Sequence, residues 1–527
     1  MTDQEPQFEQ RDRGGRQISF LRVVMAMAII AGGVMGGMYL LDRPKATATP
    51  LPNNNAWTAP YVDATITPFF AFEEPGDDVN DLVLAFVVAH VDDACTPAWG
   101  SFFDLESAAE ELDLDRRLAR LRQTGKDAVV SFGGALNDEL ATVCTNHDRL
   151  VDAYSSVVDR YEVSTIDLDL EGEGLADLAA HERRAQALVE VQAAVRDDDG
   201  DLAIWLTLPA ATGGLTAMGV AALDATLAAG VDVAGVNLMV MNFGEGRVMP
   251  SGTESAGSLA TMSEAVEASL TSASSQVLGA WRRAGLDITP AESWARLGAT
   301  PMIGRNDIVI DVFTQADAIA LVELAETNGL GRVSYWSLNR DRECGPNNDP
   351  VVSASNHCSH EDQDPLAYAQ IFSGIPGRVV DAAGGDVSWA KIELLEDDPD
   401  RSPYSIWRPD RIFSGGDKTV WHGYVYEAKW WSEGDNPEAA VVDAWDTPWR
   451  IVGPVLPEDL IEPIVVPSGV VPDWDGGVVY LEGDQTWLNG NVYEAKWWNQ
   501  GFQPNRELAN ESESPWLELD PALFVDG

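Results

Sequence analysis

The segment Ser164-Thr165-Ile166-Asp167-Leu168-Asp169-Leu170-Glu171-Gly172 alternates apolar and acidic side chains. Alternate side chains of a β-strand lie on the same face, so Asp167, Asp169 and Glu171 share one face and the apolar residues share the other. The apolar face suits packing beneath helices. Three carboxylates on one buried face are not typical of a hydrophobic core, because burying an unpaired charge costs several kcal/mol of folding free energy or more. The segment therefore predicts a buried strand that carries an acidic site.

Short apolar runs alternate with longer Ala/Leu/Glu/Arg-rich stretches on both sides of this strand. The longer stretches, such as 107–125 and 180–195, predict helices. Eight strands that mostly alternate with helices over residues 61–375 are typical of an α/β fold of the (β/α)8 barrel type. A doubly wound open sheet is the alternative. The predicted strands are Tyr61–Phe70, Leu82–Ala89, Ala128–Gly134, Ser164–Gly172, Ala203–Pro209, Val233–Gly244, Ala299–Asn306 and Arg332–Asn339.

Glu171 lies at the carboxyl end of the predicted fourth strand, where barrel enzymes place their active sites. Carboxylates packed together repel one another, so at least one is expected to hold a proton near neutral pH. A protonated acid beside an ionised partner is what cleavage of an acetal requires. A metal site and an inert acidic strand are the alternatives. Neither His90 nor His181 has ligand spacing with this strand, so we expect no metal and no cofactor.

The charge and cysteine content limit the class of protein further. The formal net charge is −51, which disfavours a nucleic-acid partner because phosphates would be repelled. An uncharged or cationic substrate fits better. The four cysteines lie as two separate pairs in the chain, and pairing would require an oxidising compartment. The candidate disulfides are Cys95 with Cys144 and Cys344 with Cys358.

The N-terminus predicts export. Residues 23–41 are uncharged and mostly apolar, and they follow a short N-terminus, residues 1–22, which we expect to be cytoplasmic and whose basic residues are Arg11, Arg13, Arg16 and Arg22. A cleaved signal peptide has an apolar region of about 7–15 residues and a spanning helix about 20, so the length favours a transmembrane anchor. Ala46-Thr47-Ala48, in the linker 42–60, resembles a cleavage site and keeps a signal peptide open. Both interpretations place the rest of the chain outside the cell or at its surface.

The residues after 375 contain a repeat with a constant offset. Val-Tyr-Glu-Ala-Lys-Trp-Trp occurs at 425–431 and again at 492–498, and eleven of the 18 tryptophans lie between Trp407 and Trp516. The repeat predicts two copies of a small all-β module. The expected parts are a linker at 376–403, module 1 at 404–454, a Pro-rich linker at 455–468 and module 2 at 469–520.

The acidic strand resembles the family-18 glycoside hydrolases, the chitinase family, whose motif is Asp-x-x-Asp-x-Asp-x-Glu. Asp167, Asp169 and Glu171 match it, and Ser164 stands at its first position. The resemblance covers about residues 61–373 and implies a barrel. The other segments that resemble this family are the Ser-x-Gly-Gly motif at 131–134 and two segments of a bacterial chitinase subgroup at 298–307 and 334–341.

This resemblance implies a substrate-assisted retaining mechanism. Glu171 would protonate the glycosidic oxygen, Asp169 would hold the substrate acetamide, and Asp167 would tune Asp169. Trp336 would form the floor beneath the reacting sugar. The sixth strand departs from the family, which generally supplies a Tyr and an Asp there. The expected substrate-binding residues are Trp336, Met239, Met241, Asn242, Ser131, Gly133 and Gly134.

The tail repeats resemble the small chitin-binding modules of bacterial chitinases, which carry an Ala-Lys-Trp-Trp signature. The resemblance implies that aromatic rings stack on sugar faces. Adjacent side chains of an extended segment face opposite ways, so one Trp of each pair is expected in the core, and which one stays open. The candidate binding residues are Tyr426, Trp430, Trp431, Tyr493, Trp497 and Trp498.

The sequence thus predicts an exported, monomeric chitinase that acts on chitin and N-acetylglucosamine oligosaccharides and meets the membrane only through its N-terminal segment. The first alternative is a chitin-binding protein whose barrel has lost catalysis, which Met241 and Asn242 keep open. The second is a hydrolase of another N-acetylglucosamine polymer, such as peptidoglycan or N-glycans.

Overall fold

The structure is a computed structural model of the 527-residue chain. Within the described residues, no helix is long and apolar enough to cross a membrane. The predicted anchor at 23–41 lies outside the described residues, as does most of the predicted linker at 376–403. The structure describes residues 56–198, 200–247, 260–345, 354–375, 377, 394–399, 401–439, 441, 446–461, 465–506, 514–519 and 521–524.

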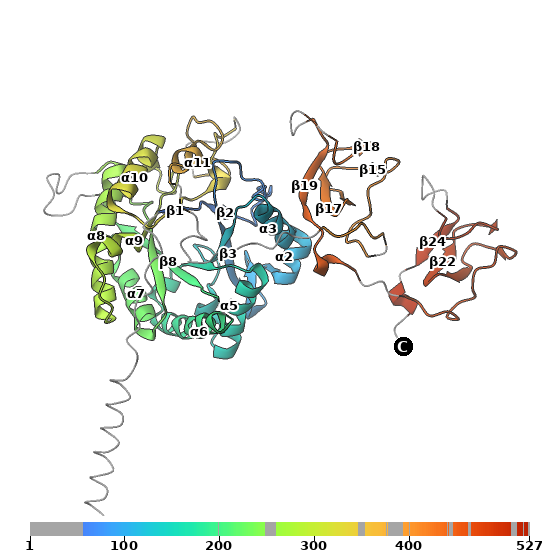
Figure 1. Cartoon of the computed structure of the whole chain (residues 1–527), viewed down its shortest axis with the longest axis horizontal. Helices are drawn as coiled ribbons and strands as arrows, with labels where there is room; N and C mark the ends of the chain where they lie inside the picture. The colour runs from blue at the N-terminus through green and yellow to red at the C-terminus, as the bar shows by residue number, and fades with distance from the viewer. Residues whose placement is uncertain are drawn as a thin grey trace, which may run out of the picture. The chain divides into compact units, whose positions relative to one another are not determined.

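Residues 57–333 form a closed barrel of parallel strands, as the alternating pattern predicts (Figure 1). The first strand is interrupted at Ala59 and Pro60: its first half pairs with the last strand and its second half with the next one. This double pairing closes the sheet. The strands, in spatial order, are β1 (Trp57–Thr58) with β2 (Tyr61–Asp63), β3 (Leu82–His90), β6 (Ala128–Gly133), β7 (Thr165–Asp169), β8 (Ala203–Ala211), β10 (Val233–Met239), β11 (Leu297–Thr300) and β14 (Arg332–Val333).

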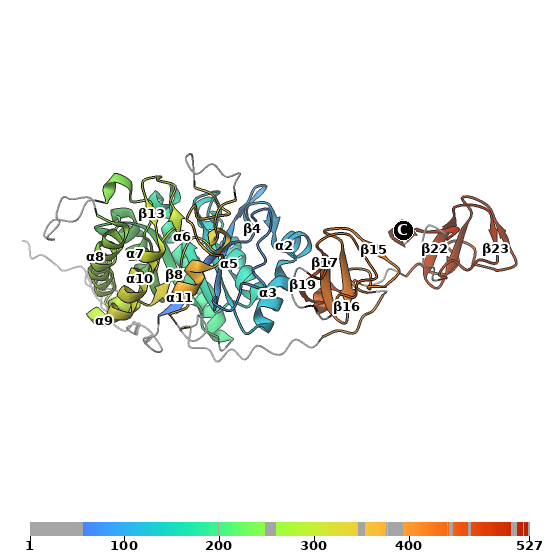
Figure 2. The same cartoon turned by 90° about the horizontal axis from the view of Figure 1, so that it is seen from above.

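Helices surround these strands, and their apolar faces bury the outer face of the sheet (Figures 1 and 2). Ile166 and Leu168 of β7 point outward into this layer and are fully buried. The predicted helix at 107–125 is split at Asp113, whose φ of 50° ends one helix and starts the next. The helices are α2 (Leu105–Leu112), α3 (Leu114–Gln123), α4 (Leu140–Val143), α5 (His147–Tyr161), α6 (Leu178–Asp197), α7 (Ala217–Ala229), α8 (Met262–Arg283), α9 (Pro290–Ala295), α10 (Gln315–Asn328) and α11 (Ala367–Phe372).

The predicted strand boundaries differ from the structure mainly at the carboxyl ends. The first strand begins at Trp57, inside the predicted linker 42–60, and ends at Asp63 rather than Phe70. β10 ends at Met239, where we expected Gly244. The residues beyond these ends leave the sheet and form loops at the barrel mouth. Shorter additional strands lie in such loops: β4 (Asp93–Trp99), β5 (Phe103–Asp104), β9 (Gly214–Leu215), β12 (Gly304–Arg305) and β13 (Val312–Phe313).

All four cysteines form the two disulfide bonds that the sequence suggested. Cys95 is bonded to Cys144, and Cys344 to Cys358. The first bond ties the β4 strand to the residue after α4, and the second closes a loop beyond β14. Both bonds therefore fasten loops that follow barrel strands.

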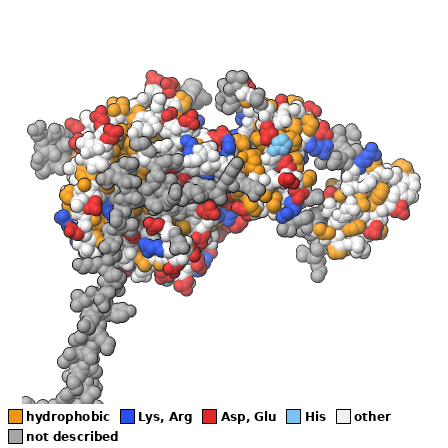
Figure 3. All heavy atoms as spheres, viewed as in Figure 1, with side chains coloured by type: hydrophobic (Ala, Val, Ile, Leu, Met, Phe, Trp, Pro, Cys, Tyr) orange, Lys and Arg blue, Asp and Glu red, His pale blue; other side chains and the backbone are white. Residues whose placement is uncertain are grey.

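Two small all-β modules follow the barrel, in orange and red in Figure 2. In each, a three-stranded antiparallel sheet accompanies a two-stranded one, and the arrangement is repeated from one module to the next. Asp and Glu side chains are spread over the visible surface of the chain, as the net charge requires (Figure 3). Module 1 contains β15 (Ile412–Phe413), β16 (Lys418–Trp421), β17 (Tyr424–Ala428), β18 (Ser432–Glu433) and β19 (Trp449–Pro454), and module 2 contains β20 (Val479–Tyr480), β21 (Gln485–Leu488), β22 (Asn491–Ala495), β23 (Asn499–Gln500) and β24 (Trp516–Leu519).

Candidate active site

The acidic strand occupies the position that its alternation predicts. β7 lies between β6 and β8 in parallel register, with Asp167 opposite Ser131 on one side and Trp205 on the other. Asp167 is fully buried, Asp169 is nearly so, and Glu171 is half-buried just beyond the strand end. The three carboxylates thus run from the barrel interior toward its mouth.

Asp167 is compensated by four groups from four other strands. Arg332 of β14 donates from Nη1 to Oδ1 over 2.6 Å, and Thr207 of β8 donates to the same oxygen over 2.6 Å. The hydroxyls of Tyr61 and Ser131 donate to Oδ2 over 2.8 Å and 2.7 Å. A buried carboxylate with this set of donors is a stable anion. Its charge therefore serves as a fixed negative charge beneath Asp169.

Burial and neighbouring charges raise the pKa values of both Asp169 and Glu171. Burial, and then the charges of Glu171 and Asp167, raise the pKa of Asp169 well above its usual value, although Arg332 opposes this. Burial, and then the charge of Asp307, raise the pKa of Glu171. The Oδ1 atom of Asp169 is buried and has no hydrogen-bond partner among the described residues. The site therefore contains two acids with raised pKa values and a buried carboxylate oxygen that makes no hydrogen bond within the described part of the chain.

The Ser-x-Gly-Gly segment, residues 131–134, packs directly against the acidic strand β7. Ser131 is fully buried and donates to Asp167, so it cannot contact a substrate as we expected. Gly133 has a φ of 99°, and a Cβ there would lie 2.1 Å from the carbonyl oxygen of Asp169. At Gly134 a Cβ would lie 2.8 Å from the Phe86 ring. These residues position the acidic strand by close packing, and the prediction that they bind substrate directly is wrong for Ser131.

Trp336 closes the top of the buried network. It follows β14, is partly buried, and stacks on Phe86 at 5.5 Å between ring centroids with an interplanar angle of 14°. Its ring also lies 6.0 Å from that of Tyr61, whose hydroxyl donates to Asp167. A partly buried indole fixed on two other rings is suited to stack against a pyranose.

At the end of the sixth strand, Asn242 contacts an acid from another loop, Asp307. Met239 ends β10, and Met241 and Asn242 follow it, all three partly buried. Asn242 donates from Nδ2 to Oδ2 of Asp307 over 3.0 Å and accepts from the Ile308 backbone N–H. Asp307 is exposed in the loop between β12 and β13. Asn242 therefore joins an acid of the seventh strand's loop to the end of the sixth strand.

Three residues of this site were not singled out from the sequence: Arg332, Tyr61 and Asp307. Arg332 stands 165 positions from Asp167, so no local pattern pairs them. A basic residue inside a run predicted as a barrel strand was an available signal, because it needs a buried partner. Asp307 lies at the end of a segment that was singled out only as a whole.

The exposed aromatic residues of the modules correct two expectations. Both Trp residues of each pair are exposed, at 40% and 59% for Trp430 and Trp431 and at 44% and 61% for Trp497 and Trp498. The expectation that one of each pair is core is wrong. Tyr426 and Tyr493 are instead buried in the two module cores, so they are not free to stack on sugars.

A cluster of three candidate metal ligands occurs in the described part of the chain, formed by Cys344, Cys358 and His360. The two cysteine sulfurs are bonded to each other, so they offer no thiolate. The acidic site itself is held by Arg332 and hydroxyl donors, which are groups suited to a carboxylate rather than to a cation. We assign no cofactor to it.

The barrel and its acids define a class of protein, an enzyme with carboxylic acids of raised pKa at the mouth of a (β/α)8 barrel. No protein-family model matches the chain. The catalytic domain of a hyperthermophilic chitinase from Pyrococcus furiosus is similar in structure, with a TM-score of 0.51 and 25% identity, covering 64% of this chain and 99% of that one.

Two curated relatives are also chitinases by name. A probable bifunctional chitinase/lysozyme of Escherichia coli (strain K12) is 35% identical over 318 residues, which are 60% of this chain and 34% of that protein. Endochitinase 11 of Metarhizium anisopliae is 35% identical over 285 residues, 54% of this chain and 52% of that protein. The chain thus spans about a third to a half of the length of these relatives. The similarity supports a glycoside hydrolase activity.

Proposed function

We propose that the chain is a family-18 chitinase that hydrolyses β-1,4 linkages between N-acetylglucosamine units with retention of configuration. The observation that carries this proposal is the pair of Asp169 and Glu171, both with raised pKa values, above an ion-paired Asp167. An acid that stays protonated is needed to cleave a glycosidic bond, and an acceptor beside it is needed to hold the acetamide.

In the proposed first step Glu171 donates its proton to the glycosidic oxygen, and the bond to the anomeric carbon breaks. The carbonyl oxygen of the substrate acetamide attacks that carbon and forms an oxazolinium ion. Asp169 accepts a hydrogen bond from the acetamide N–H through Oδ1 and stabilises the positive charge. In the second step the Glu171 carboxylate takes a proton from water, the hydroxide adds to the anomeric carbon, and the acetamide is restored.

We propose that Asn242 and Asp307 together replace the acid that the family generally carries on the sixth strand. Asp307 has a carboxylate, and Asn242 holds it through one oxygen. Trp336 is the proposed floor of the subsite that holds the reacting sugar. Met239 and Met241 can supply only apolar contacts at this position.

The two small modules are proposed to bind chitin. What supports this is the exposed Trp pair at the same place in each module, because large aromatic rings rarely stay in solvent without a ligand. Lys429 and Lys496 lie 4.9 Å above the rings of Trp430 and Trp497, respectively, which keeps each indole in place. Two weak sites on one chain gain avidity on a repeating polymer.

We also propose that the chain is exported and stays at the cell surface or outside the cell. The apolar segment 23–41 with its basic flank supports this, as do the two disulfide bonds, since such bonds persist in oxidising compartments.

The test is the release of products from N-acetylglucosamine oligomers by the full chain and by Glu171→Gln. We expect short oligomers from the parent and loss of release by at least about a hundredfold in the variant, the range of general acid catalysis. Exposed Glu173→Gln, two residues further on, is the matched control and should keep parental activity. No hydrolysis by the parent, together with retained adsorption to chitin, would indicate a binding protein on an inactive barrel.

A second candidate is hydrolysis of peptidoglycan, because one relative is named a bifunctional chitinase/lysozyme. Product analysis on purified peptidoglycan and on chitin separates the two. Release from peptidoglycan alone would replace chitin as the substrate and leave Glu171 as the acid.

A further inference from the structure

Helix α3 of the barrel is buried almost all the way round. Arg116, Arg117, Leu118 and Ala119 are consecutive and all buried, and successive side chains of a helix point about 100° apart. A surface helix of a barrel buries one face against the sheet. The other face of α3 is therefore covered by something else. Strand β19 of module 1 lies against it.

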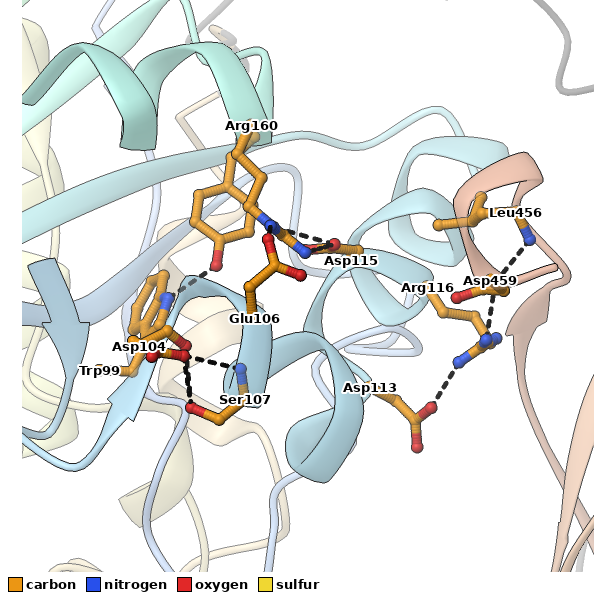
Figure 4. A network of polar contacts seen from close by, with 11 residues as sticks. Trp99, Asp104, Glu106, Ser107, Asp113, Asp115, Arg116, Arg160, Leu456 and Asp459 are labelled. Atoms are coloured by element: carbon orange, nitrogen blue, oxygen red, sulfur yellow. Dashed lines mark hydrogen bonds and ion pairs between the residues drawn. The ribbon is translucent and has the colours of Figure 1, made fainter. Parts of the chain in front are cut away.

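Ion pairs cross this contact from the α3 end of the barrel to module 1 and to residues 455–461, which directly follow it. Arg116 reaches Asp459 with 2.7 Å between Nη2 and Oδ2, and also contacts Asp113 (Figure 4). Lys418 of module 1 contacts the other oxygen of Asp113. Asp113 and Arg116 are each only 3% exposed. Charges this deeply covered need partners on both sides of the contact.

A second group of charges lies beside the first. Glu73 of the barrel, 1% exposed, accepts a hydrogen bond from Nε of Arg117 over 2.8 Å and also contacts Arg450 of module 1. Arg450 in turn is 3.1 Å from Glu427 within its own module. The barrel and the module thus share a charge network at this second place.

The backbones also approach closely. A Cβ on Gly453 of β19 would lie 2.3 Å from the carbonyl oxygen of Arg116, so no larger residue fits there without displacing one part from the other. Glycine at this position allows the strand to lie directly on the helix.

Three module 1 residues of this contact are not repeated in module 2. At the constant offset, Lys418 corresponds to Gln485, Arg450 to Leu517, and Gly453 to Asp520. The Ala-Lys-Trp-Trp segment is identical in both modules, and Trp407, Tyr426, Ala428 and Trp449 of module 1 recur as Trp474, Tyr493, Ala495 and Trp516 in module 2. The copies thus share the Trp-bearing segment and part of the core, whereas these three residues that meet the barrel are not repeated in module 2.

We propose that module 1 is docked on α3 as a fixed part of the barrel, and that module 2 is an independent tethered unit. The barrel surface formed by Glu73, Asp113, Arg116 and Arg117 is the docking site, and its partner is module 1 of the same chain. One consequence rests on the proposed function: docking would give Trp430 and Trp431 a constant orientation relative to the active site. The docking itself does not depend on that function.

The test gives module 1 the contact face of module 2. The variant Lys418→Gln/Arg450→Leu/Gly453→Asp uses residues that module 2 already carries at those positions, so the module should still fold. Gln485→Lys/Leu517→Arg, the reverse change in module 2, is the matched control. Hydrogen–deuterium exchange of the full chain is measured for α3 and, as a folding control, for β16 and β17.

We expect α3 amides to exchange about tenfold faster in the triple variant, with β16 and β17 unchanged, and parental exchange in the control. Arg116→Glu, which leaves module 1 untouched, should accelerate exchange of the α3 residues in the same way. Parental exchange of α3 in both the triple variant and Arg116→Glu would overturn the proposal. Because the readout requires no substrate, it stands whether or not the chain hydrolyses chitin.

Discussion

Arg332 and Asp167 form an ion pair in the barrel interior, with 2.6 Å between Nη1 and Oδ1 and no exposure of either side chain. Removing one partner of such a pair leaves the other charge buried and uncompensated. We therefore expect Arg332→Gln to lower the free energy of unfolding by roughly 3–5 kcal/mol. It should also raise the pKa of Asp169 further, because the charge of Arg332 opposes the other causes.

Chemical denaturation measures the first effect, and an exposed ion pair provides the comparison. Arg283 pairs with Asp224 at the surface, where the two side chains are 53% and 38% exposed. Arg283→Gln should cost no more than about 1 kcal/mol, since solvent screens an exposed pair. An equal decrease in the free energy of unfolding for Arg332→Gln and Arg283→Gln would contradict the argument that burial makes the Arg332–Asp167 pair more important for stability.

The alternation of residues 164–172 was enough to place the acidic site, because side-chain direction in a strand follows from sequence position alone. It could not identify the group that compensates Asp167, since Arg332 comes from the opposite side of the closed barrel. Closure itself depends on Trp57 and Thr58, which precede the run predicted as the first strand. Two residues are too short to give a pattern.

Alternation also explains where the prediction for the modules was wrong. β17 ends at Ala428, and Trp430 and Trp431 lie between β17 and β18, outside either strand, so the rule that neighbours face opposite ways does not apply to them. Tyr426 lies inside the strand, where the rule does apply, and its inward position places it in the core. The end of a strand is the property that sequence patterns locate least well.

Asp307→Asn should shift the pH dependence of hydrolysis toward lower pH. Glu171 acts as an acid only while protonated, so activity falls as the pH rises through its pKa. The charge of Asp307 is one cause of the raised pKa of Glu171, and its removal lowers that pKa. The alkaline limb of the kcat/KM profile on soluble oligomers is therefore expected at lower pH in the variant.

An NMR titration of the Glu171 carboxyl carbon measures the same shift without substrate. Glu245→Gln serves as the control, because Glu245 is an exposed acid after β10 whose charge is not among the causes that raise the pKa of Glu171. If the pKa of Glu171 is unchanged in Asp307→Asn, the proposal that the charge of Asp307 acts on Glu171 in the active site is wrong.

Gly133→Ala should be far more harmful than Gly125→Ala. Both glycines have positive φ, 99° and 80°, so alanine is strained at either position by about 1–2 kcal/mol. Only at Gly133 would the added Cβ meet another atom, the Asp169 carbonyl oxygen at 2.1 Å; at Gly125 nothing lies within 4 Å. The extra overlap should cost roughly a further 1–3 kcal/mol and displace Asp169. Thermal unfolding and oligomer hydrolysis of the two variants check this, and similar losses in both would refute it.

Trp431→Ala with Trp498→Ala should reduce adsorption to insoluble chitin while leaving the fold intact. These are the more exposed members of the two pairs, at 59% and 61%, so their removal leaves no cavity. Either single change should reduce adsorption by about tenfold or less, because the other module still holds the polymer, and the double change by much more.

Trp449→Ala is the matched control for this prediction. Trp449 is 3% exposed, packs on Phe413, and donates from Nε1 to the Asp435 carbonyl oxygen over 2.8 Å. Its truncation should destabilise module 1 by roughly 3–5 kcal/mol, as expected for a buried aromatic residue. Adsorption isotherms and calorimetric unfolding separate the two effects. Parental adsorption by the double variant would show that the exposed Trp pairs do not hold the polymer, and the binding face of the modules would have to lie elsewhere.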